Sequence, residues 1–142
     1  MTLGYLVIGY GGTALALLFG IWAVIRGGWA ERTGIGMILA GWFLTPVIQT
    51  SFTPGIPILC LDTGLAVALF IISCFSRRVW SILVTACLSA NAIAHVSEFL
   101  APPHHKLRWA HVLTSDVLGG LLVALCFAIA VWECGRLGSK SR

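Results

Sequence analysis

The sequence predicts an all-α integral membrane protein, a bundle of about five transmembrane helices. Hydrophobic residues make up 58% of the 142-residue chain and charged residues only 10%, and the mean hydropathy is +0.96. Soluble domains carry about 25% charged residues, so this chain has too few charges for a water-exposed surface. The apolar residues also gather into five runs, each near the roughly 20 residues that cross a bilayer as a helix. We therefore expect a single transmembrane domain over residues 1–142.

The five apolar runs predict helices over residues 3–25, 35–51, 56–75, 79–100 and 109–132. No Lys or Arg precedes the first run, and it is too long for the apolar segment of a typical signal peptide. The second run is short and is interrupted by Pro46, which cannot donate a backbone hydrogen bond. Pro54 and Pro57 separate the second run from the third, so these two runs form either two spans or a re-entrant hairpin.

The basic residues predict how the helices are oriented. Five spans would put seven of them on one side of the membrane: Arg26, Arg32, Arg77, Arg78, Arg136, Lys140 and Arg142. Lys106 and Arg108 would lie on the other side. Since Lys and Arg favour the cytoplasmic side, we expect an external N-terminus and a cytoplasmic C-terminus. Four tryptophans fall near the predicted helix ends, as interfacial aromatic residues do: Trp29, Trp80, Trp109 and Trp132.

The partners that the sequence indicates are the lipid bilayer and other membrane helices. The net charge of +4 can be balanced by anionic lipid headgroups and requires no nucleic acid. Small residues recur at four-residue spacing in three runs, where they allow close helix contacts. The three sets are Gly12, Ala16 and Gly20; Ala86, Ala90 and Ala94; and Gly120, Ala124 and Ala128. They predict packing inside one chain, in a homo-oligomer or in a larger membrane complex.

Ionisable residues inside the runs mark the candidate site. Each costs at least ~2.5 kcal/mol at the bilayer centre. Five are found: Asp62, His95, Glu98, His111 and Asp116. With a rise of ~1.5 Å per residue, Asp62, His95 and Asp116 would lie within roughly 10 Å of the external face. Asn91, His95 and Glu98 share one face of their helix. We expect a polar pocket near the external face, lined by Asp62, Asp116, Asn91 and Gln49.

Several functions fit such a pocket. Its residues could fix helix packing in a non-enzymatic structural or accessory subunit, or bind a ligand in a binding protein. His95 and His111 could instead be axial ligands of a b-type haem in an electron-transfer subunit, or the pocket could hold a quinone.

A third alternative is transport of protons or a divalent metal, with His104, His105 and Glu98 as metal ligands. Against transport, the inner halves of the runs are almost purely apolar apart from Ser73. A hydrolase would need Asp62, His95 and Ser97 or Ser115 as a triad, and no nucleophile motif surrounds either serine. The sequence therefore favours a non-enzymatic role.

One resemblance adds to this interpretation. The stretch LDTGLAVALFIISCFSRRVWSILVTACLSANAIAHVSEFL, residues 61–100, resembles a group of small multi-span bacterial inner-membrane proteins. The shared pattern is an Asp early in one helix, a turn with Arg-Arg and Trp, and a His late in the next helix. Asp62, Trp80 and His95 are the matching positions. The resemblance implies a multi-helix inner-membrane protein and carries no activity with it.

Overall fold

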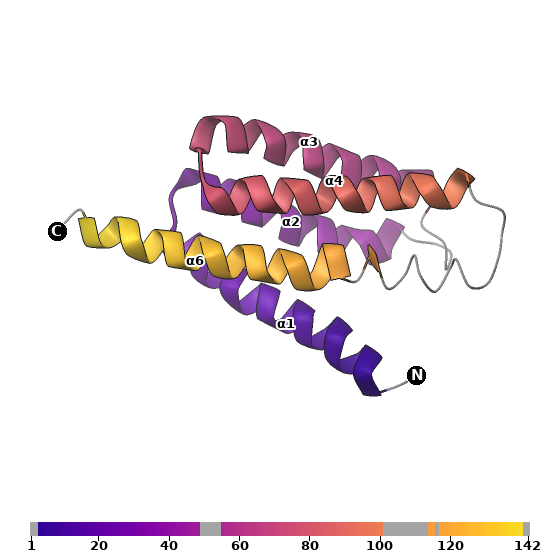
Figure 1. Ribbon diagram of the computed structural model, residues 1–142, viewed down its shortest axis with the longest axis horizontal. Coiled ribbons are helices and arrows are strands. Elements are labelled where there is room, and N and C mark those ends of the chain that lie inside the picture. Colours follow the sequence, from indigo (N-terminus) through magenta and orange to yellow (C-terminus); the bar gives the residue numbers. More distant parts are fainter. Residues whose placement is uncertain (1–2, 49–54, 101–113, 116, 141–142) are drawn as a thin grey trace.

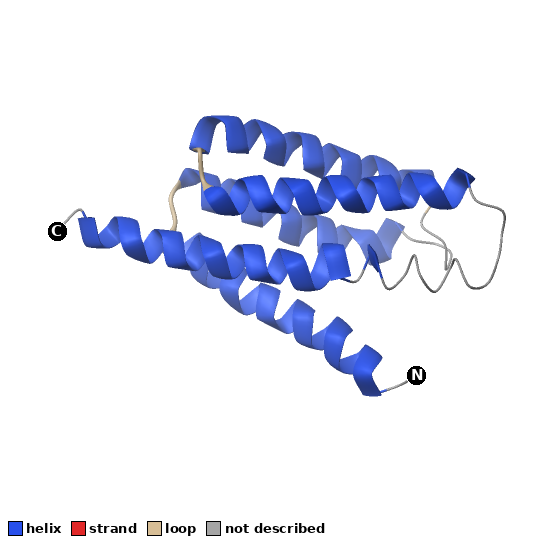
Figure 2. Cartoon of the chain, viewed as in Figure 1, coloured by secondary structure: helices blue, strands red, loops and turns tan. Residues whose placement is uncertain are grey.

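The computed structural model describes residues 3–48, 55–100, 114–115 and 117–140 (Figure 1). Five long α-helices and one π-helical turn follow in order: α1 (Leu3–Arg26), α2 (Trp29–Ile48), α3 (Ile56–Ser76), α4 (Val79–Leu100), η1 (Val117–Leu121) and α6 (Leu122–Lys140). The described residues contain no strand (Figure 2). The predicted all-α class is confirmed.

Three helical segments of the described chain are long and apolar enough to cross a membrane. They are Ile56–Ser76 in α3, Val79–Ser97 in α4, and Val117–Arg136, which joins η1 to α6. The apolar part of α1 whose side chains are described, Gly11–Arg26, is shorter. The exposed surface of the helices is rich in large apolar side chains, as a lipid-facing surface requires. The chain is therefore a membrane protein.

Consecutive helices run in opposite directions, so the bundle has two distinct ends (Figure 1). One end holds all five arginines of the described residues: Arg26, Arg32, Arg77, Arg78 and Arg136. We call it the arginine end. The opposite end holds Asp62, near the start of α3, and His95, near the end of α4, and we call it the histidine end. α3 packs most extensively against α4, and α1 packs against α6.

The second helix begins earlier than its apolar run predicts, at Trp29 rather than at residue 35. The Glu31 carboxylate explains the difference, because its Oε2 accepts a hydrogen bond of 2.9 Å from the Gly28 backbone N–H. A glutamate in the first turn that binds the backbone preceding the helix stabilises the helix start. Pro46 lies inside α2, which continues to Ile48. The predicted interruption at Pro46 is therefore wrong: the helix continues past it, although the missing N–H removes one i→i−4 hydrogen bond.

The third helix begins where its apolar run begins. Gly55 precedes it and Pro57 lies in its first turn, where the missing N–H costs no intrahelical bond. Pro54 and the rest of residues 49–54 lie outside the described chain. Two residues, Arg77 and Arg78, connect α3 to α4. Arg77 adopts the left-handed conformation, with φ of 52°, and its N–H donates to the Ser73 carbonyl at 3.1 Å.

The last apolar run is not one regular helix from 109 to 132. Residues 109–113 and 116 lie outside the described chain, Val117–Leu121 form the π-helical turn η1, and α6 continues to Lys140. The turn contains the adjacent glycines Gly119 and Gly120. Only proline has a lower helix propensity than glycine, so a local irregularity at this pair is expected.

The small residues of α1 pack inside the chain. A Cβ on Gly12 would lie 3.6 Å from the Leu121 backbone, and one on Gly20 would lie 3.1 Å from the Phe127 ring. Ala16 lies between them and is fully buried. The absence of side chains thus lets α1 approach η1 and α6 closely. On α4, by contrast, Ala86 is exposed.

Candidate functional site

A polar cluster lies between α3 and α4 at the histidine end. The Nε2 atom of His95 lies 2.9 Å from the Asp62 Oδ2 atom, and Asn91 Nδ2 donates to the same oxygen at 2.9 Å. The Asn91 Nδ2 and His95 Nε2 atoms are 3.3 Å apart. Asn91 and His95 are one helical turn apart on α4, so both reach the single carboxylate on α3. We call these three residues the Asp–Asn–His cluster.

The cluster is shielded from the surface of the bundle. His95 is 5% exposed, Asn91 is 6% exposed, and the Asp62 side chain is 14% exposed. A lone charge would be costly in such surroundings, whereas an ionisable group with a hydrogen-bonding partner beside it loses less on leaving water. The contact between Asp62 and His95 therefore makes it feasible to keep two ionisable groups inside a membrane bundle.

Two buried side-chain oxygens, one of them in this cluster, have no hydrogen-bond partner within the described part of the chain. They are Asn91 Oδ1 and Ser115 Oγ. The π-helical turn passes beside Asn91, because a Cβ on Gly119 would lie 3.9 Å from Asn91 Nδ2. Buried polar atoms usually have a partner, and unpartnered ones often indicate a bound water or ligand. Asn91 Oδ1 can accept a hydrogen bond from such a group.

Only some of the predicted site residues fall in the described chain. Asp62, Asn91 and His95 are brought together. Gln49, His104, His105, His111 and Asp116 lie outside the described residues, and Glu98 lies in α4 with a side chain outside the description. The haem pair His95 and His111 and the metal set His104, His105 and Glu98 thus remain predictions. Within the described ranges, no group of three or more His, Cys, Asp or Glu side chains could hold a metal ion.

A second polar cluster lies at the arginine end, and the sequence analysis did not find it. Glu31 is fully buried. Its Oε1 accepts a hydrogen bond of 3.1 Å from Trp80 Nε1 and lies 3.5 Å from Arg78 Nε, while its Oε2 binds Gly28. The sequence does carry a signal for it, because Glu31 is three residues after Gly28, the spacing of a helix-capping glutamate.

Another carboxylate joins α6 to the start of α4. The two oxygens of Glu133 accept hydrogen bonds from the backbone N–H groups of Val79, at 3.1 Å, and Trp80, at 3.4 Å. The first N–H groups of a helix have no partner within that helix, and a negative charge there is favourable. Glu133 therefore caps α4 from a helix that is distant in sequence.

The helix halves at the arginine end were expected to be almost purely apolar apart from Ser73, and this expectation is wrong. Ser76 and Ser81 are 3.3 Å apart, and Ser73 and Thr85 are 3.2 Å apart, each pair joining α3 to α4. Ser73, Ser81 and Thr85 also donate to backbone carbonyls within four residues, as hydroxyls in ordinary helices do, so the sequence does not distinguish them as contacts between helices. Buried apolar side chains still separate this end from the Asp–Asn–His cluster: Leu65, Leu69, Val84 and Leu88.

Comparison with protein families, curated proteins and solved structures finds no match for this chain. The Asp–Asn–His cluster is the better candidate site, because it includes a buried acceptor without a described partner. The Glu31 carboxylate, in contrast, has protein donors on both of its oxygens.

Proposed function

We propose that this protein is a small, non-enzymatic subunit or binding protein of the bacterial inner membrane, with the Asp–Asn–His cluster as its binding centre. We include in this proposal five spans, an external N-terminus and a cytoplasmic C-terminus. The alternating helix directions support that topology, since the arginine end would then face the cytoplasm, as basic residues prefer. The cluster would lie toward the external face.

The observation that carries the proposal is the shared carboxylate of Asp62. Two donors from α4 converge on one oxygen from α3, and Asn91 presents its other polar atom, Oδ1, as an acceptor beside η1. π-helical turns are rare and often occur at functional sites. A group with a hydrogen-bond donor, on a small molecule or on a partner subunit, matches this arrangement.

The other functions have less support from the contacts. Haem iron bound to His95 through Nε2 would replace the contact with Asp62. Ser97 is exposed and donates to the Ala94 carbonyl, which is a local helix contact and no part of a triad. Transport would need a polar route past the apolar layer of Leu65, Leu69 and Leu88.

The first test is purification of the intact chain in a mild detergent. We would record the optical spectrum, oxidised and then dithionite-reduced, with elemental analysis for iron, copper and zinc and mass spectrometry of everything that co-purifies. We expect no haem band and a co-purifying subunit or polar ligand. A sharp reduced band with near-stoichiometric iron would contradict the proposal in favour of electron transfer.

A matched pair of variants then links the partner to the cluster. His95→Gln removes the imidazole, whereas Ser97→Ala changes an exposed residue two positions along the same helix. We expect His95→Gln to release the co-purifying group about tenfold more readily, or about 1.4 kcal/mol, because the imidazole contacts both Asp62 and Asn91 and so positions the amide that offers Oδ1. Equal retention in both variants would refute a binding role for the cluster.

A further inference from the structure

The arginine end carries positive charge that the described chain does not neutralise. Two of its arginines have protein acceptors, since Arg78 pairs with Glu31 and Arg32 Nε donates weakly to the Val24 carbonyl at 3.4 Å. The other three, Arg26, Arg77 and Arg136, are exposed and belong to no ion pair in the described part of the chain. The carboxylates of Glu31 and Glu133 at this end already accept hydrogen bonds from protein donors.

Two of these three arginines share a local arrangement. The sequences WAVIR, ending α1, and WECGR, near the end of α6, each place a tryptophan four residues before an arginine. The Arg26 guanidinium carbon lies 5.8 Å from the centre of the Trp22 ring, and that of Arg136 lies 4.5 Å from the Trp132 ring. Residues four apart share a helix face, so each ring supports its arginine.

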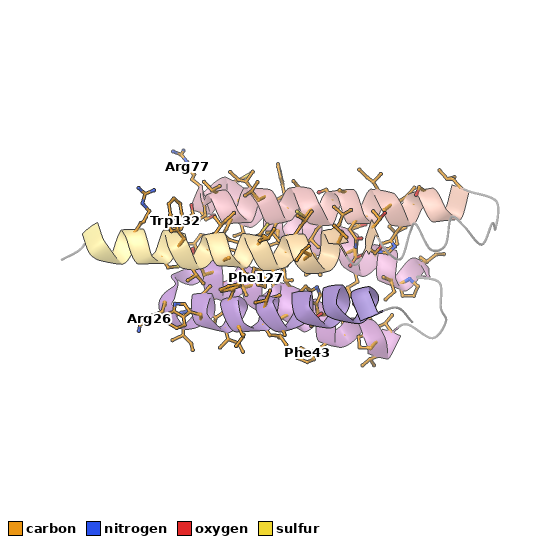
Figure 3. The ribbon with its side chains drawn as sticks, turned by 60° about the horizontal axis from the view of Figure 1, so that its bottom comes forward. Arg26, Phe43, Arg77, Phe127 and Trp132 are labelled. Carbon is orange, nitrogen blue, oxygen red and sulfur yellow. The ribbon has the colours of Figure 1, made fainter. Side chains whose placement is uncertain are left out.

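Both tryptophans face outward, with 56% of Trp22 and 58% of Trp132 exposed. An exposed tryptophan at a helix end is typical of the level of the lipid headgroups. A guanidinium held over such a ring keeps its N–H donors at that level, and its planar fork matches two phosphate oxygens. The two pairs lie on different sides of the bundle, as the positions of Arg26 and Trp132 in Figure 3 show.

We infer that the two Trp–Arg pairs, together with Arg77, form binding sites for the phosphate groups of anionic lipids at the arginine end. Charge complementarity selects anionic over zwitterionic headgroups, since the sites present cations with no carboxylate partner. The tryptophan rings select a lipid over a soluble anion, because they contact the glycerol and upper acyl region at the same depth. This inference holds for either orientation of the chain in the membrane.

The test uses the full-length chain in a neutral detergent. Native mass spectrometry with equal amounts of phosphatidylglycerol and phosphatidylcholine would give their relative affinities. We expect phosphatidylglycerol to bind several-fold more tightly. Arg26→Gln with Arg136→Gln should weaken its binding by about fivefold for each arginine removed. The same double change should leave phosphatidylcholine binding unaltered.

The matched control is Lys106→Gln with Arg108→Gln, which removes the same charge from the segment that follows α4. It should change phosphatidylglycerol binding less than about twofold. Equal affinity of the unmodified chain for the two lipids would overturn the inference, as would equal losses in the two double variants. Displacement of the lipid by polyglutamate would assign the surface to an acidic protein segment instead. Displacement by inorganic phosphate, at constant ionic strength, would assign it to a soluble anion.

Discussion

At the scale of single residues, the buried polar groups of this protein make contacts between helices. The Asp62 carboxylate contacts Asn91 and His95 near the end of α4. The Glu31 carboxylate accepts a hydrogen bond from Trp80 near the start of the same helix. Both acids come from a neighbouring helix and lie where an uncompensated charge would be unfavourable. Each pairing therefore ties α4 to a partner helix and defines how the two are rotated relative to each other.

The coupling between Asp62 and His95 can be measured with a double-mutant cycle. We expect Asp62→Asn and His95→Gln to be non-additive in the free energy of unfolding by about 0.5–2 kcal/mol, the range of interhelical hydrogen bonds in membranes. Unfolding in mixed micelles would supply the measurement. Asp62→Asn combined with Ser97→Ala is the control and should be additive. Additivity of the first pair would mean that the contact has no energetic role.

Replacing Glu31 tests the second cluster. Glu31→Gln keeps the size of the side chain but removes its charge and one of its two acceptors, so a buried donor loses its partner. We expect a loss of about 1–3 kcal/mol in the free energy of unfolding. The neighbouring exposed change, Arg32→Gln, should stay within about 0.5 kcal/mol. If both variants unfold alike, the buried carboxylate does not stabilise this end.

At the scale of elements, the helices approach each other where side chains are smallest. Gly34 of α2 faces Trp80, and an added Cβ would lie 2.8 Å from the ring atom Cη2. Gly36, two residues later, has nothing within 4 Å of that position. The two glycines are equivalent in local helix propensity, so only the packing of α2 against Trp80 of α4 and Leu69 of α3 distinguishes them.

The same substitution at these two glycines should therefore have opposite effects. Gly34→Ala forces the buried Trp80 to move, and we expect a cost of about 1–3 kcal/mol. Gly36→Ala should be neutral or stabilise by up to about 1 kcal/mol, because alanine favours helix more than glycine. The free energy of unfolding of both variants, measured side by side, checks this. Equal effects would show that α2 does not pack on Trp80 as described.

At the scale of the whole molecule, the two ends of the bundle are polar and the middle is apolar. The arginine end is basic, and there Glu31 and Glu133 accept hydrogen bonds that join neighbouring helices. The histidine end holds the Asp–Asn–His cluster. Ala86 of α4 faces outward, so this part of the α4 small-residue stripe is open to another helix.

The proposed topology makes a prediction about the chain termini. With five spans, the two termini lie on opposite sides of the membrane. A C-terminal fluorescent-protein fusion should be bright in the cytoplasm, and an N-terminal epitope should be accessible in intact spheroplasts. A fusion to Arg78, between α3 and α4, is the internal control and should report the same side as the C-terminus. Termini on one side would require an even number of spans.

The sequence by itself determined the helical class of the protein and the common level of Asp62 and His95 along the bundle. A chain with 10% charged residues and apolar runs of membrane length has few alternatives to a helical bundle, and the fixed rise per residue put Asp62 and His95 at one level. It did not determine the start of α2 or the π-helical turn, because both depend on specific hydrogen bonds and glycine packing rather than on hydrophobicity.

Only the tertiary structure decided which groups meet. Residue spacing gives the depth and the face of each side chain on its own helix, but not the rotation of one helix against another. Packing sets that rotation, and it brought Asn91 and His95 onto one oxygen of Asp62 and turned Glu31 toward Trp80. The role of Glu133 as the cap of α4 could not be predicted either, because its partners lie more than fifty residues away in the chain.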